Sequence, residues 1–85
     1  MHRMNMLLDA VGRSEMLATN AEQELGYCMS AMECIDQRQI DDSRDLSYRL
    51  VVAFMSDGPD DPLFPNESLD DIISDYRKFV RSLPD

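Results

Sequence analysis

A run of apolar residues at helical spacing fills the first part of the chain and constrains its fold more than any other feature. Between positions 4 and 35 the spacing alternates between three and four residues, and nine of the ten residues are apolar. This N-terminal seam consists of Met4, Leu7, Val11, Ser14, Ala18, Ala21, Leu25, Cys28, Met32 and Ile35. Residues at this spacing share one face of an α-helix. The sequence therefore predicts a helical face that the rest of the chain covers.

Two arrangements fit the N-terminal seam. Its unbroken register favours one helix over residues 3–37, because a turn would normally reset the phase. Against continuity, Gly12 and Gly26 each cost about 1 kcal/mol relative to alanine inside a helix. Thr19, with Glu22 three residues later, also has the form of a capping box. The alternative is therefore two helices, over 3–17 and 20–37, with a kink or turn near Thr19.

A second helix is predicted over residues 43–56. The polar stretch 37–42 ends the first element, and Asp41, Asp42 or Ser43 can cap the next one. Apolar residues then recur at helical spacing from Leu46 onward. The stretch 56–59 (Ser-Asp-Gly-Pro) stops this helix, because proline cannot continue it.

The last helix is predicted over residues 67–83, with Asn66 or Ser68 as its cap. Its apolar stripe is the cleanest in the chain and consists of Leu69, Ile72, Ile73, Tyr76, Phe79, Val80 and Leu83. No segment alternates with period two, so no sheet is expected. The prediction is an all-α single domain over residues 1–85. It is a three-helix bundle, or a four-helix bundle if the first helix breaks near Thr19.

Length and composition exclude several classes of protein. A chain of 85 residues has room for one domain, and 44% hydrophobic residues suffice for a globular core. No apolar run approaches the roughly 18 residues of a membrane span. Asp9 interrupts the N-terminal apolar stretch, which argues against a signal peptide. The cytoplasm is the expected compartment, and Cys28 and Cys34 fit a reducing one.

The charge is strongly acidic and limits the partners. The chain has seventeen acidic and eight basic residues, which gives a net charge of −9. Nucleic acid and anionic membranes carry the same sign and are disfavoured as direct partners, whereas a basic protein surface would be attracted. The carboxylates predicted to form a docking face are Asp41, Asp42, Asp45, Asp57, Asp60, Asp61, Glu67, Asp70, Asp71 and Asp75. They are expected to make one end of the bundle strongly negative.

No pattern in the chain indicates catalysis, a cofactor or a metal site. His2 is the only histidine, and with Cys28 and Cys34 it lacks the paired spacing of a zinc site. Neither cysteine has a nearby histidine to act as its base. The aspartates around Gly58 lack the ligand pattern of a calcium loop. We therefore expect a protein that is not an enzyme.

The N-terminal apolar segment suggests a second surface. Seven methionines are many for this length, and flexible methionine side chains can adapt to a partner. The expected adaptor or dimer face consists of Met4, Met6, Leu7, Leu8, Val11 and Met29. If the fold leaves this segment exposed, a symmetric homodimer would bury it against its mate.

Two functional hypotheses follow. The first is a stoichiometric inhibitor that neutralises a basic nucleic-acid-handling protein through its acidic face. In size, charge and helical pattern the chain resembles bacteriocin immunity proteins, antitoxins and phage-encoded antagonists of host defence, although no motif carries this resemblance. The alternative is a helical adaptor, similar to a secretion chaperone, that binds through the methionine-rich apolar face.

Overall fold

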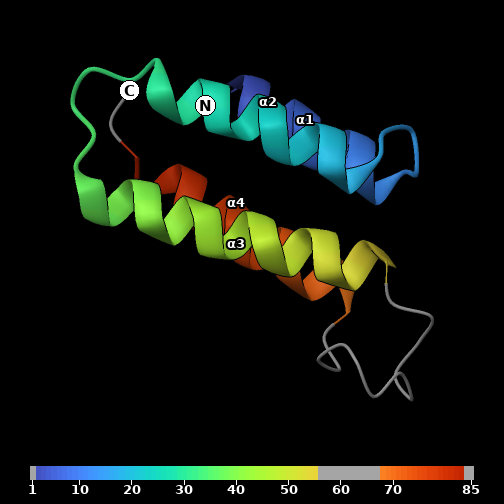
Figure 1. The fold of residues 1–85 in the computed structure, drawn as a ribbon. Coiled ribbons are helices and arrows are strands. Elements are labelled where there is room, and N and C mark those ends of the chain that lie inside the picture. The colour runs from blue at the N-terminus through green and yellow to red at the C-terminus, as the bar shows by residue number, and fades with distance from the viewer. Residues whose placement is uncertain (1, 56–67, 84–85) are drawn as a thin grey trace.

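Four helices form the part of the chain that the structure describes. The computed structural model describes residues 2–55 and 68–83. The helices are α1 (His2–Gly12), α2 (Ala18–Ser30), α3 (Gln37–Met55) and α4 (Leu69–Arg81), and no strand occurs among the described residues. They run alternately in opposite directions, and α1 and α3 each pack against both α2 and α4 (Figure 1). The all-α prediction is confirmed, in its four-helix form.

A tight turn separates α1 from α2. Ser14 adopts a left-handed backbone conformation with φ of 60°. The amide of Ser14 donates to the carbonyl of Val11 at 3.1 Å, and the amide of Glu15 donates to the carbonyl of Ala10 at 2.8 Å. These two bonds are those of a Schellman motif, which ends a helix by turning the chain away. The prediction of one long first helix is therefore wrong.

The register of the N-terminal seam survives this turn because of the length of the connection. The core residues Val11 of α1 and Ala18 of α2 are both fully buried and lie one heptad apart in the chain. Ser14, the one polar residue of the seam, is the residue in the turn. The predicted cap at Thr19 is also wrong, since α2 begins after Leu17, which makes no side-chain cap bond.

A capping box starts α3 earlier than predicted. The Asp36 carboxylate accepts from the Gln39 amide at 2.9 Å, and the Asp36 amide donates to the Gln39 side-chain oxygen at 3.1 Å. This reciprocal pair satisfies two amides at the helix start. The helix therefore begins at Gln37, and the predicted start at 43 is wrong.

The cap of α4 is Ser68, one of the two residues predicted for it. Its hydroxyl accepts from the Asp71 amide at 3.1 Å. Asp70 and Asp71 lie in the first turn, and Lys78 and Arg81 lie in the last. Each side-chain charge is therefore opposite in sign to the partial charge of the helix end beside it, which stabilises the helix.

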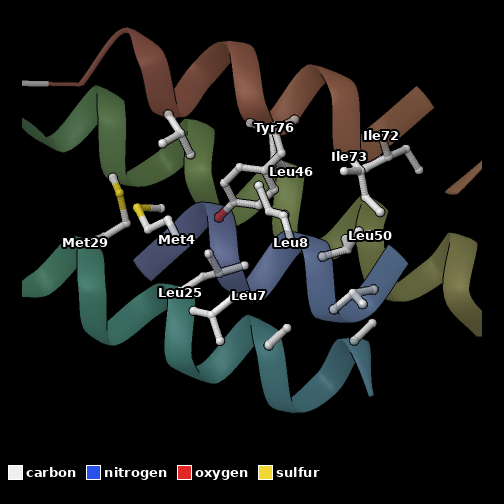
Figure 2. Packing of buried hydrophobic residues seen from close by; sticks show 14 of the residues in the cluster. Met4, Leu7, Leu8, Leu25, Met29, Leu46, Leu50, Ile72, Ile73 and Tyr76 are labelled. Atoms are coloured by element: carbon white, nitrogen blue, oxygen red, sulfur yellow. The ribbon is translucent and has the colours of Figure 1, made fainter. Parts of the chain in front are cut away.

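One core joins all four helices, and no helix in the described ranges is both long and apolar enough to cross a membrane. Figure 2 shows side chains from each helix meeting at the centre. The core contains Met4, Leu7, Leu8, Val11, Ala18, Ala21, Leu25, Met29, Leu46, Leu50, Ile72, Ile73, Tyr76, Val80 and Leu83. Burying each large aliphatic side chain contributes about 1.5–3 kcal/mol relative to leaving it exposed. The N-terminal seam thus supplies the α1 and α2 side of this core.

A buried hydroxyl network fixes the position of α4 against α3. The phenol oxygen of Tyr76 lies 2.8 Å from the Ser43 hydroxyl and 2.9 Å from the Ser47 hydroxyl. It also donates to the Ser43 carbonyl at 3.4 Å. A phenol has one proton and two lone pairs, so these three contacts satisfy it completely. Tyr76 is thereby held level with residues 43–47 of α3.

Candidate functional site

The described acidic residues predicted to bind a partner are all exposed. They are Asp41, Asp42 and Asp45 on α3 and Asp70, Asp71 and Asp75 on α4. Only Asp75 forms an ion pair with another described residue, at 3.3 Å from Arg49. Asp57, Asp60, Asp61 and Glu67, which were also predicted, lie outside the described residues.

Four of these carboxylates form a row along the contact between α3 and α4. We call it the acidic row, and it consists of Asp42, Asp45, Asp71 and Asp75. Asp42 and Asp45 precede Arg49 by seven and four residues, so all three share one side of α3. Asp71 precedes Asp75 by four residues on α4 in the same way. The Arg49–Asp75 pair joins the two sides and places the row at the helix contact.

The acidic row lies along the side of the bundle, and not at one end as the order in the chain had suggested. Because Tyr76 is level with residues 43–47, the axial distance from Asp42 to Asp71 is about 12 Å at 1.5 Å per residue. Asp41 and Asp70 flank the row, each about 100° further around its own helix. Two cations lie beside the row without an ion pair among the described residues: Lys78 on α4, and Arg38 on α3, four residues before Asp42.

The predicted adaptor or dimer face is mostly internal to the bundle. Met4, Leu7, Leu8, Val11 and Met29 are buried in the core, where Figure 2 shows most of them. Met6 is the exception, with 55% of its surface exposed. A partner could reach the other five side chains only if the helices separated.

A surface groove between α2 and α3 was not predicted. Its volume is about 500 Å³, and its lining combines residues of both helices: Thr19, Glu22, Gln23, Gly26, Tyr27, Met29, Ser30, Ile40, Ser43 and Arg44. Gly26 opens the α2 wall, because a β-carbon placed there would meet no atom within 4 Å. The signal in the sequence is Gly26 beside Tyr27 within a helix, a glycine that helix propensity disfavours.

Ion pairs tie together three of the four helix contacts at the surface. They are Arg3–Glu24 between α1 and α2 at 2.9 Å, Arg49–Asp75 between α3 and α4, and Arg77–Asp9 between α4 and α1. Within the described residues, the α2–α3 contact has none. Glu22 and Arg44, on opposite walls of the groove, each lack an ion-pair partner there.

Two side chains at the contacts of α4 have shifted pKa values for clear physical reasons. The hydrogen bond from Arg77 lowers the pKa of Asp9, because it stabilises the ionised carboxylate. Burial raises the pKa of Tyr76, because an anionic phenolate would lose its hydration. Both groups belong to contacts that hold α4 in place, and neither lies in the groove or the acidic row.

The sulfur and carboxylate groups of the described residues do not assemble into a metal centre. Cys28 is half-buried on α2, and Cys34 is exposed in the connection to α3, both as free thiols. No group of three or more histidine, cysteine or acidic side chains suited to a metal ion occurs within residues 2–55 and 68–83. Comparison with family models, curated proteins and solved structures gives no match to this chain.

Proposed function

We propose that this protein is a non-enzymatic binding module that neutralises a partner protein with a basic surface. The observation that carries the proposal is the acidic row on α3 and α4, flanked by Asp41 and Asp70. Five of these six carboxylates have no ion-pair partner among the described residues. Carboxylates held on a folded surface attract a basic partner and orient its approach.

The dimensions of the acidic row suit one protein interface. A standard interface buries about 800 Å² on each partner, which corresponds to a patch roughly 30 Å across. The row and its two flanking residues extend about 15 Å along the helices, by the rise of 1.5 Å per residue. A single basic surface could therefore contact all six carboxylates at once.

The test compares capture of basic proteins by wild type and by a charge-reversed variant. Asp42→Lys/Asp71→Lys reverses the two ends of the acidic row. Glu15→Lys/Glu33→Lys is the matched control, because it makes the same change in net charge at exposed positions away from the row. Each protein is immobilised and exposed to cell lysate, and bound proteins are quantified at low and high salt.

We expect wild type and the control to retain one shared basic protein that the row variant loses. Its binding should weaken steeply with salt, because the contacts are between exposed charges. Retention of the same proteins by the row variant, or binding that salt does not weaken, would overturn the proposal. Thermal unfolding of each variant checks that the fold is intact.

A further inference from the structure

The proposed function leaves the α2–α3 face unused. This face comprises the groove and the exposed side chains beside it, and it is turned toward the viewer in Figure 1. Tyr27 lines the groove and is 61% exposed. Tyr48 lies one turn after Arg44 on the same side of α3 and is 68% exposed, and Met55, two turns further, is 58% exposed. Large apolar side chains concentrated in this way mark a contact surface.

The charge of the groove points to a particular occupant. Its lining contains one acid, Glu22, and one base, Arg44, so it is neutral in a chain of net charge −9. A neutral lining offers little attraction to a strongly basic partner, and Asp41, three residues before Arg44, adds one acid on the same side of α3. Two copies of an acidic chain can, however, approach each other across such a lining with little charge repulsion.

The heights of these residues along the bundle make the face complementary to itself. Glu22 and Tyr27 on one wall and Arg44 and Ile40 on the other line the same groove. Because α2 and α3 run in opposite directions, counting outward from their connection pairs Ser30 with Gln37. At the same rise per residue, this count pairs Glu22 with Asp45, one residue from Arg44, and Tyr27 with Ile40. A two-fold rotation about an axis parallel to the groove relates the two copies. It places α2 of one copy against α3 of the other and leaves each residue's position along the bundle unchanged. Arg44 then meets Glu22 of the second copy, and Tyr27 meets Ile40 of the second copy, each contact occurring twice.

We propose that the α2–α3 face binds a second copy of this chain, forming a symmetric homodimer with two reciprocal Glu22–Arg44 ion pairs. The apolar contact comes from Tyr27, Tyr48 and Met55, which the monomer leaves exposed. The α3–α4 contact lies about 140° around α3 from Arg44, the angle from Arg44 to Arg49 at 100° per residue. The acidic row at that contact therefore stays accessible in the dimer, whereas the flanking Asp41, about 60° from Arg44, lies at the edge of the dimer face.

The test is sedimentation equilibrium of the full chain from the low micromolar to the millimolar range. Wild type is expected to pass from monomer to dimer across this range. Glu22→Arg leaves only bases at the two paired positions, and Arg44→Glu leaves only acids. By symmetry each substitution converts both ion pairs into repulsions, so each variant alone should dimerise at least about tenfold more weakly.

An equimolar mixture of the two variants gives the decisive readout. Glu22→Arg and Arg44→Glu complement each other across a shared two-fold interface, so the mixture should form a heterodimer with affinity close to that of wild type. Arg38→Glu is the control, because it makes the same charge change on α3 at an exposed position about 120° away from Arg44. It should dimerise like wild type.

Three results would overturn the homodimer. They are a wild type that stays monomeric throughout, a dimer that neither reversal weakens, and a mixture that fails to associate. Circular dichroism melting of each variant shows that lost association is not lost folding. Because Glu22→Arg and Arg44→Glu leave the acidic row unchanged, failure of the dimer does not bear on the proposed basic partner, which is tested separately.

Discussion

Tyr76 joins α4 to α3 through both core packing and hydrogen bonds. Among the described residues it is the largest fully buried side chain, and its hydroxyl lies inside a mainly apolar core. Ser43 and Ser47, one turn apart on α3, satisfy that hydroxyl, and no side-chain polar atom buried in the described parts of the chain lacks a partner. Such a network favours one alignment of the two helices, because sliding α4 by a turn would leave buried groups unpaired.

Replacing Tyr76 with phenylalanine should destabilise the fold by about 1–3 kcal/mol, the cost of leaving buried serine hydroxyls without a partner. Urea unfolding at neutral pH measures this loss. Tyr48→Phe is the control and should change stability little, since Tyr48 is exposed. The triple variant Ser43→Ala/Ser47→Ala/Tyr76→Phe should be no less stable than Tyr76→Phe, because it removes the stranded groups together. The role of the network would be contradicted if Tyr76→Phe were as stable as wild type, or if the triple variant were far less stable than Tyr76→Phe.

The burial of Tyr76 also makes the stability of the fold depend on pH. Burial raises the pKa of Tyr76 above its ordinary value near 10, so above pH 10 the folded chain holds a proton that the unfolded chain releases. The stabilisation is therefore complete below pH 10 and is lost as the pH rises toward the folded pKa. Tyr76→Phe should flatten this alkaline decline.

At the scale of the elements, helix ends decide where the chain turns. The Schellman motif after α1 requires a left-handed residue, and serine occupies that position. A β-carbon is unfavourable there, which is why glycine is the usual residue. The capping box formed by Asp36 and Gln39 likewise sets where α3 begins.

Ser14→Gly should stabilise the protein by about 0.5–1 kcal/mol, because it relieves the left-handed strain without removing any bond of the turn. The matched control is Ser74→Gly, the same substitution at an exposed position inside α4. That control should destabilise by about 0.5 kcal/mol through lower helix propensity. Chemical denaturation of both variants gives the comparison. If both substitutions destabilise equally, the left-handed turn at Ser14 is not strained.

At the scale of the whole molecule, α1 and α4 come from opposite ends of the chain and close the bundle. Asp9 and Arg77 form an ion pair across this contact. The hydrogen bond from Arg77 keeps the pKa of Asp9 below its ordinary value. A lowered carboxyl pKa contributes stability above the unfolded pKa near 3.9, and that stability is lost as the pH falls through the folded pKa.

Asp9→Asn should therefore reduce the loss of stability on acidification. The free energy of unfolding is measured at neutral pH and near pH 3 for wild type, for Asp9→Asn and for Asp42→Asn. The last is an exposed aspartate without an ion pair among the described residues. The fall on acidification should be smaller in Asp9→Asn than in either other protein. An equal fall in all three would show that the pair with Arg77 does not stabilise the fold.

Part of the candidate site could be predicted from the sequence. The carboxylates of α3 and α4 could be predicted as exposed, since helical spacing alone separates them from the apolar stripes. The acidic row could not, because it depends on which side of α3 meets α4 and at what height. The α2–α3 groove was missed for the same reason, since it needs two helices and an open position at Gly26.

The sequence by itself determined the helical class and most of the residues that face the core, and it limited the cap of α4 to Asn66 or Ser68, because periodicity and local hydrogen bonding depend on near neighbours. Tertiary structure decided that the N-terminal seam folds back on itself. A heptad between Val11 and Ala18 reads the same whether the chain continues or reverses. The reversal brings α1 and α2 side by side, where their apolar faces cover a shared core that one straight helix could not enclose.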